Sequence, residues 1–182
     1  MFNVWILSVS DCAMISISKT DNFSEIKNIR RTIFSELPLS DNDLFDEDDS
    51  VLDQFLIQND DESVGAFRLR PLGNSNKIER MGILPTFHSN GFGRAALEEI
   101  KTLSRNLNMA RLVLDSLFDV REFYEKSGFV QDGDVYSKVG IPHVKMYFEL
   151  WFSYSCSSES SLLDGLIGTY NIVMVSLCKI GI

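Results

Sequence analysis

Residues 81–100 constrain the fold of this chain more than any other stretch. The apolar run Met81-Gly-Ile-Leu-Pro85 is typical of a strand end, and the glycines Gly91 and Gly93 follow it as a bend. The first N–H groups of a helix have no partner within the helix and lie at the positive end of its dipole. We therefore predict a strand, a loop and a helix whose N-terminus binds phosphate. Apolar residues recur at helical spacing after the bend, at Ala96, Leu97, Ile100, Leu103 and Leu107.

The composition favours one globular domain and argues against a nucleic-acid partner. A chain of 182 residues with 45% apolar and 24% charged residues is long enough for one complete core. The formal charge is −9, and no cluster of lysine or arginine offers the basic stripe that binds phosphate backbones. The acidity suits a cationic acceptor such as an amine, although solubility alone accounts for it.

The cysteines and histidines predict neither a disulfide framework nor a metal site. The three cysteines, Cys12, Cys156 and Cys178, are odd in number. The two histidines, His88 and His143, lack the spacing of paired metal ligands, so we expect no metal. The N-terminus lacks the basic region of a signal peptide, and we expect a cytoplasmic protein.

The periodicity predicts the order strand, helix, β-hairpin, strand, helix, strand, helix, strand, strand. A first helix over 22–37 is capped by Ser24 or Asn22 and stopped by Pro38. Residues 40–53 carry seven acidic residues and predict a solvated loop that can include a short helical turn. The predicted strands cover 14–18, 54–58, 64–69, 77–84, 111–116, 129–130 and 143–150, and the long helix ends near Asn106 or Asn108.

A short helix is predicted through Phe123 and Tyr124. The spacing of Asp119-Val-Arg-Glu122 is that of a capping box at its start. Gly128 stands where a left-handed residue ends a helix.

The folded domain is expected over 14–150, between two extensions. Residues 1–13 are apolar and irregular, either an added edge strand or a disordered segment. Residues 151–182 include an apolar tail at the short limit of roughly 20 residues for a membrane span, interrupted by polar and charged residues. We expect this tail to pack as a strand or helix on the domain or on a second subunit, in a monomer or homodimer, rather than to anchor the chain in a membrane.

The glycine bend also matches a dinucleotide-binding pattern. Gly91-Phe-Gly-Arg-Ala-Ala96 fits G-x-G-x-x-A, and Asp115 ends the next predicted strand, where a ribose-binding acid belongs. Six residues separate the predicted strand end at Leu84 from Gly91, whereas a dinucleotide fold turns almost at once. The flanking segments also predict hairpins rather than repeated βαβ units, which disfavours this alternative.

Three ordered motifs resemble the GNAT superfamily of N-acetyltransferases. His88-Ser-Asn-Gly-Phe-Gly93 is similar to its Arg/Gln-x-x-Gly-x-Gly/Ala loop, and Phe123-Tyr-Glu-Lys-Ser-Gly-Phe129 is similar to its FY-x-x-x-GF block. The segment 133–146, with its Gly-Ile-Pro-His, resembles the ending of the ElaA-type subgroup, as do 33–36 and 45–49 more loosely. The resemblance covers about 14–150.

The resemblance implies an α+β fold with α/β/α layers. Its mixed, mostly antiparallel sheet is splayed between two parallel strands, 77–84 and 111–116, and is flanked by helices. The implied activity is acetyl transfer from acetyl-CoA, as co-substrate, to an amine acceptor in a ternary complex, without a metal. The residues implied for coenzyme A binding are Met81, Ile83, His88, Ser89, Asn90, Gly91, Phe92, Gly93, Arg94, Phe123, Tyr124 and Lys126.

Four residues are catalytic candidates. By resemblance, Tyr124 matches the tyrosine that protonates the leaving thiolate, although it equally fits the apolar face of a short helix. Glu79, Asp115 and His143 fall on strands that would border the cleft and are the candidate bases, each with a structural role as its alternative.

Two positions depart from the family pattern. His88 replaces the usual Arg or Gln, which weakens one contact to phosphate unless Arg94 compensates. Leu117 stands where the ElaA-type subgroup has Gln, so a polar group on the acceptor side is missing. A non-catalytic acyl-CoA sensor is therefore the alternative function, and an NAD(P)-binding enzyme is the more remote one.

Overall fold

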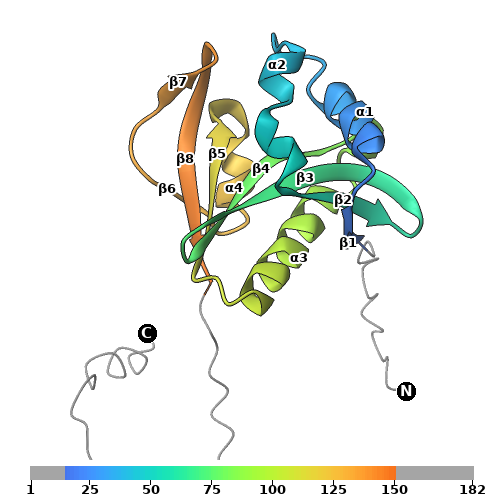
Figure 1. Cartoon of the computed structure of the whole chain (residues 1–182). Helices are drawn as coiled ribbons and strands as arrows, with labels where there is room; N and C mark the ends of the chain where they lie inside the picture. The colour runs from blue at the N-terminus through green and yellow to red at the C-terminus, as the bar shows by residue number, and fades with distance from the viewer. Residues whose placement is uncertain (1–14, 151–182) are drawn as a thin grey trace, which may run out of the picture. The chain divides into compact units, whose positions relative to one another are not determined.

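A mixed eight-stranded sheet runs through residues 15–150, the part of the chain that this computed structural model describes (Figure 1). The order is β1-β2-β3-β4-β5-β8-β6, with β7 paired to β8. Only β4 and β5 are parallel within this part, as the sequence predicts. The predicted extensions 1–13 and 151–182 lie outside the described residues. The strands are β1 Ile15–Thr20, β2 Asp53–Asn59, β3 Glu62–Leu72, β4 Ser75–Ile83, β5 Arg111–Leu117, β6 Val130–Gln131, β7 Tyr136–Lys138 and β8 Ile141–Glu149.

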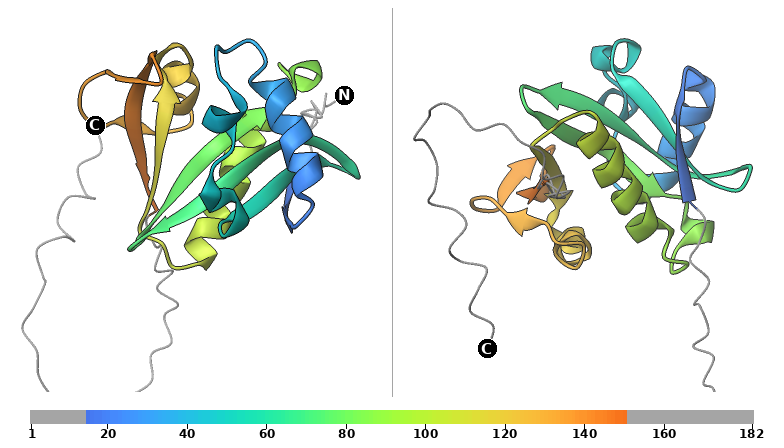
Figure 2. Two further views of the ribbon diagram at one scale, coloured as in Figure 1. Left: turned by 45° about the horizontal axis from the view of Figure 1, so that its top comes forward. Right: turned by 90° about the horizontal axis from the view of Figure 1, so that it is seen from below.

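Helices cover both faces of this sheet (Figure 2). The helices are α1 Phe23–Ile33, α2 Asp41–Leu44, α3 Phe92–Asn106 and α4 Arg121–Glu125. α1 and α2 lie on one face and α3 on the other. No helix within residues 15–150 is both long and apolar enough to cross a membrane.

Alternating residues on β2 and β3 build a core on each face. Phe55 and Phe67 stack with ring centroids 4.8 Å apart and pack toward α3. Their neighbours Leu56 and Ala66 point to the opposite face and pack against Ile26 of α1. Burying a side chain such as Ile26 stabilises the fold by roughly 1.5–3 kcal/mol.

α1 begins at the predicted cap and ends earlier than predicted. The side chain of Asn22 accepts a hydrogen bond from the backbone N–H of Glu25 at 3.3 Å, so Asn22 rather than Ser24 is the cap. The helix ends at Ile33, and the prediction that it continues to Leu37 is wrong. Pro38 disfavours a helical conformation at Leu37, and the chain turns away before it.

β4 and β5 pair only over their first residues. Residues 75–78 face 111–114, and beyond this register the two strands separate (Figure 1). A bulge in β4 lies where they diverge: Arg80 has a left-handed φ of 54°, and the register with β3 shifts beside it. Bulges bend a strand, so this one accompanies the predicted splay.

Residues 40–53 contain the predicted helical turn, as α2 and a 3-10 turn over Glu47–Ser50, but Asp49 is buried against arginines, so the prediction of a solvated loop is wrong in part. Arg68 binds Asp46 at 2.6 Å, Asp49 at 2.8 Å and Glu79 at 2.6 Å. The network balances four cations and four carboxylates, because a buried charge without a partner costs several kcal/mol. Its members are Arg30, Arg68, Arg70, Arg80, Asp46, Asp48, Asp49 and Glu79.

The connection after β5 follows the predicted order with one correction. A 3-10 turn over Phe118–Val120 precedes α4, and Val120 occupies the cap position without a side-chain bond. The predicted capping box at Asp119 is therefore wrong, because the turn places Asp119 before the cap. Gly128 has a φ of 85°, and the prediction of a left-handed residue there is confirmed.

Candidate functional site

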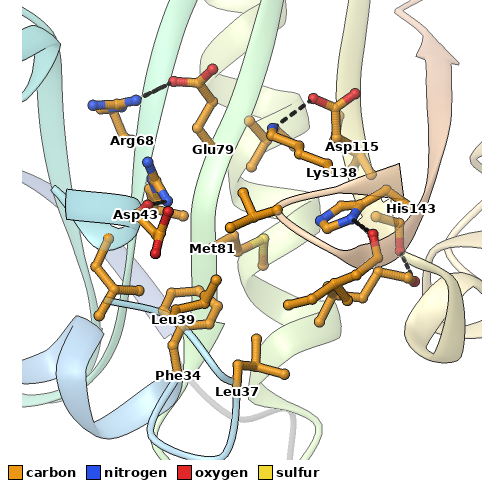
Figure 3. A pocket seen from close by; sticks show the side chains of 18 of the residues that line it. Phe34, Leu37, Leu39, Asp43, Arg68, Glu79, Met81, Asp115, Lys138 and His143 are labelled. Carbon is orange, nitrogen blue, oxygen red and sulfur yellow. Dashed lines mark hydrogen bonds and ion pairs between the residues drawn. The ribbon is translucent and has the colours of Figure 1, made fainter. Parts of the chain in front are cut away.

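A cavity of about 460 Å³ opens where β4 and β5 separate (Figure 3). The segment from the end of α1 to α2 forms one wall, and β7 with β8 forms the opposite one. All four catalytic candidates, Glu79, Asp115, Tyr124 and His143, line this cavity. Four elements distant in sequence, β4, β5, α4 and β8, thus bring the predicted residues together.

A row of unpaired backbone amides lies at the start of α3. None of the N–H groups of residues 89–94 has a hydrogen-bond acceptor within the described part of the chain. The first internal bond of the helix runs from the Ala95 N–H to the Gly91 carbonyl at 3.1 Å. Gly91 has a left-handed φ of 78°, and no atom lies within 4 Å of where a Cβ would stand. We call residues 89–94 the amide cradle; free N–H groups at a helix N-terminus bind anions.

His88 is tied to the end of β4. Its Nε2 lies 2.9 Å from the carbonyl oxygen of Ile83, and since a carbonyl only accepts, Nε2 carries the proton. The bond fixes the loop to the strand and occupies one of the main-chain groups expected to meet coenzyme A. On its other side, β4 has no strand partner after Ile78 within the described residues, so the edge carrying Met81 is open to the cavity.

α4 connects the amide cradle to the cavity. A Cβ at Gly93 would stand 3.1 Å from the ring of Phe123, which is tighter than ordinary van der Waals contact, so glycine favours the close approach of the two helices. The next residue, Tyr124, lines the cavity and packs edge-on against Phe123 and Phe129, with centroids 5.0 and 5.7 Å away. Lys126 is exposed and pairs with Glu122 at 3.5 Å.

Burial raises the pKa of Tyr124 to about 12. No hydrogen bond engages its hydroxyl within residues 15–150. Because the phenol keeps its proton at all ordinary pH values, the Tyr124 hydroxyl can donate a hydrogen bond and is poorly suited to act as a base.

Glu79 is bound on both carboxylate oxygens. Burial favours its neutral form, but hydrogen bonds from Arg70 at 3.1 Å and Arg68 at 2.6 Å outweigh burial and lower the pKa of Glu79. A carboxylate held this firmly by two guanidinium groups is a weak base.

Asp115 is held in a second ion cluster. Burial again favours the neutral form, but Lys77 at 2.7 Å, the Tyr136 hydroxyl and Lys138 at 3.2 Å bring the pKa of Asp115 to about 2. Asp115 is therefore ionised and engaged, and like Glu79 it is poorly suited to accept a proton near neutral pH.

His143 differs from both carboxylates. Its Nδ1 lies 2.8 Å from the carbonyl of Ile141, so Nδ1 carries the proton and Nε2 holds the lone pair. The ring packs beside Tyr136, with centroids 6.1 Å apart. Within residues 15–150, Nε2 has no hydrogen-bond partner, and it is the free basic atom of a side chain that lines the cavity.

Several lining residues were not predicted from the sequence. Leu37 and Leu39 reach the cavity because α1 ends early, and Asp43 and Lys138 reach it from α2 and β7. The turn signal at Gly140, after Lys138, was available, because a hairpin there carries its flanking residues back toward β8.

The chain matches a known family and shares its fold with solved structures. The family described as acetyltransferase (GNAT) domain matches residues 47–150. YyaT of Bacillus subtilis (strain 168) is 28% identical over 138 residues, which cover 74% of this chain and 93% of YyaT. A GNAT family acetyltransferase from Elizabethkingia anophelis with acetyl-CoA bound has a TM-score of 0.60 at 17% identity, covering 75% of this chain and 98% of that one.

The spermidine N-acetyltransferase of Vibrio cholerae, in complex with CoA and spermine, has a TM-score of 0.58 at 17% identity. The alignment covers 75% of this chain and 95% of that one. The mostly antiparallel sheet of residues 15–150 does not contain the paired βαβαβ halves of a dinucleotide-binding fold, which disfavours the NAD(P) alternative. By the family match, the chain belongs to the GNAT acetyltransferases and is an acyltransferase.

Proposed function

We propose that this protein transfers the acetyl group of acetyl-CoA to the primary amine of a small molecule or peptide, directly and within a ternary complex. The observation that carries the proposal is the link made by α4. Phe123 contacts the amide cradle at Gly93, while its neighbour Tyr124 lines the cavity. An anion site and a reaction chamber are thus adjacent in the fold.

The described residues fit coenzyme A. The free N–H groups of the amide cradle would bind the pyrophosphate, and the open space at Gly91 allows it to approach the backbone. Arg94 is exposed and has no ion-pair partner within residues 15–150, so it adds positive charge there. The open edge of β4 near Met81 would pair with the pantetheine amides. The Elizabethkingia structure, which shares the fold, has acetyl-CoA bound.

Acetyl-CoA supplies the acetyl group as an activated thioester. His143 would accept the proton of the attacking amine through Nε2, because Glu79 and Asp115 are already engaged by cations. An N–H group on the open edge of β4 would polarise the carbonyl that is attacked. Tyr124 would donate its proton toward the departing sulfur, since burial keeps the phenol protonated.

The ElaA-type assignment is part of the proposal. The segment Gly140-Ile-Pro-His143 closes the turn between β7 and β8 and begins β8, and it thereby brings His143 to the cavity. The role of this motif would be to hold His143 at the cavity. We further propose that 14–150 is the catalytic domain. The odd number of cysteines in the whole chain suits a reducing, cytoplasmic compartment.

Thiol release over a panel of primary amines, combined with calorimetric titration of acetyl-CoA, tests the proposed function. We expect acetyl-CoA to bind and thiol to appear only when an amine is present. Absence of coenzyme A binding would overturn the proposal. Binding without turnover for any amine, and with no change in Tyr124→Phe, would instead identify a non-catalytic acyl-CoA sensor.

A further inference from the structure

We infer that the acceptor is an amphipathic amine that also carries an anionic group, and that Lys138 binds this group. The inference rests on the proposed function and deepens it, because it names the class of acceptor. Its starting point is the local charge beside His143, which differs in sign from the −9 of the whole chain.

The ion network on the β3–β4 side of the cavity is electrically balanced. Arg68 and Arg70 share Glu79, Arg68 and Arg80 share Asp46, and the remaining carboxylates of the network are equally engaged. The four cations and four anions of the network leave no net charge among themselves, Lys77 also lies 3.6 Å from Glu79, and Asp43 beside Arg80 adds one carboxylate to this side. The network therefore supports the walls and offers little to a charged ligand.

A positive surplus lies on the opposite side, next to His143. Lys77 at 2.7 Å and Lys138 at 3.2 Å share the single carboxylate of Asp115. One carboxylate balances one ammonium group, so one positive charge remains. Lys138 is half exposed, and an ammonium group has three donors, of which Asp115 takes one. Lys138 and His143 lie side by side along the same wall (Figure 3). An anionic group of the acceptor is the fitting partner for the free donors.

Apolar side chains provide the rest of the binding surface. Leu37 and Leu39 line the wall opposite Val139 and Ile141. Val139 is 54% exposed and has a left-handed φ of 53°, a strained conformation for a β-branched residue. Strain of this kind persists where the side chain is useful, and here it presents an apolar group to the cavity. The acceptor thus needs an apolar body between its amine and these walls.

A polyamine is the competing class of acceptor, because the cavity has one carboxylate without a cationic side-chain partner among the described residues. Asp43 accepts from the N–H of Ser40 at 2.8 Å and from its hydroxyl at 2.6 Å. However, the guanidinium of Arg80 binds the Asp43 backbone carbonyl, so a positive charge already stands beside this carboxylate. A second ammonium group would compete with Arg80 there, which disfavours a polyamine.

Three small amines separate these classes. L-leucine has an amine, an apolar body and a carboxylate; 3-methylbutylamine lacks only the carboxylate; 1,5-diaminopentane carries a second ammonium group. We expect kcat/KM to be highest for L-leucine. In Lys138→Met, the ratio of kcat/KM for L-leucine to that for 3-methylbutylamine should fall about tenfold, as expected for one lost charge-assisted hydrogen bond. Lys145→Met, an exposed β8 lysine outside the cavity, is the matched control and should keep the ratio.

Preference for the diamine, abolished by Asp43→Asn, would overturn the inference, as would an unchanged ratio in Lys138→Met. If none of the three amines is acetylated, calorimetry of L-leucine and 3-methylbutylamine with the coenzyme A-bound protein decides the matter. Tighter binding of L-leucine that is lost in Lys138→Met supports the inference, and equal binding contradicts it. Failure of acetyl transfer alone counts against the proposed function. The calorimetric result still tests the inference about Lys138.

Discussion

The Nδ1 atom of His143 lies 2.8 Å from the carbonyl oxygen of Ile141, which leaves Nε2 as the unpaired basic atom at the cavity. We expect His143→Gln to lower kcat/KM by about 10²–10⁴-fold, the range for a lost general base, without changing acetyl-CoA affinity. Steady-state rates over a range of amine concentrations, with calorimetric titration of acetyl-CoA, check this.

His88, the other histidine of the chain, provides the control. It bonds Ile83 beside the amide cradle and does not line the cavity. His88→Gln should raise the KM for acetyl-CoA and change kcat little. A large loss of kcat in His88→Gln, with little loss in His143→Gln, would show that the base has been misassigned.

The hydroxyl of Tyr124, which lines the cavity, keeps its proton and can act as a donor. Its pKa of about 12 means that ionisation of the phenol causes no loss of activity as pH rises through the range in which enzymes are assayed. Tyr124→Phe should lower kcat by roughly 10²-fold, since a phenyl ring retains the packing against Phe129 but cannot protonate the thiolate. Single-turnover kinetics report the chemical step and calorimetry reports acetyl-CoA binding, so together they separate a loss of proton donation from a loss of binding. Equal kcat in the variant would exclude this role.

Gly91 and Gly73 form a matched pair. Both have left-handed φ angles, 78° and 60°, and open space around the position of a Cβ. Alanine at either position should cost about 1 kcal/mol of folding stability, because its Cβ disfavours this conformation. Only Gly91→Ala should also weaken acetyl-CoA binding, by about tenfold, since the strain displaces the amide cradle. Similar affinities in the two variants would place the phosphate site elsewhere.

Asp115 makes the free energy of unfolding depend on pH in the acid range. Its pKa of about 2 lies below the ordinary value of 3.8, so its contribution is complete above pH 3.8 and is lost as pH falls to about 2. The shift corresponds to roughly 2 kcal/mol. Urea unfolding at a series of pH values should show a shallower acid decline in Asp115→Asn than in the wild type. Parallel declines would mean that Asp115 carries the same pKa in the unfolded chain.

Val139 and Gly140 form the two-residue turn between β7 and β8, with φ angles of 53° and 73°. Asparagine tolerates the left-handed region far better than valine and precedes glycine in favoured hairpin turns. We expect Val139→Asn to stabilise the domain by roughly 0.5–1 kcal/mol, measured as a higher Tm. A lower Tm would show that packing of the valine outweighs its backbone strain.

Local conformational rules explain why some features were predictable. The amide cradle and the left-handed Gly128 depend on a few neighbouring residues, and both occur as the sequence predicts. The end of α1 was misjudged because the apolar spacing of Leu37 fits a helix, while Pro38 stops it sooner. Because of that error, the residues that form one wall of the cavity were not predicted from the sequence.

The arginine network was not predictable from periodicity. It joins Arg30 of α1 and Arg68 of β3 to Asp49, and no pattern within one segment shows which charges meet. A charged residue on the apolar face of α1 was the available signal. For the same reason, the sequence could not distinguish the candidate bases. The basicity of each carboxylate depends on the cations around it, and only the fold brings these together.

A crystal structure of the protein with coenzyme A bound is the most direct test of the account. We expect the pyrophosphate within hydrogen-bond distance of the N–H groups of residues 89–94. We expect the sulfur within hydrogen-bond distance of the Tyr124 hydroxyl, with the ring of His143 facing the space beside the sulfur where the amine would bind. A pyrophosphate bound away from the amide cradle, or a sulfur outside the cavity that Tyr124 and His143 line, would contradict the proposed acetyl transfer.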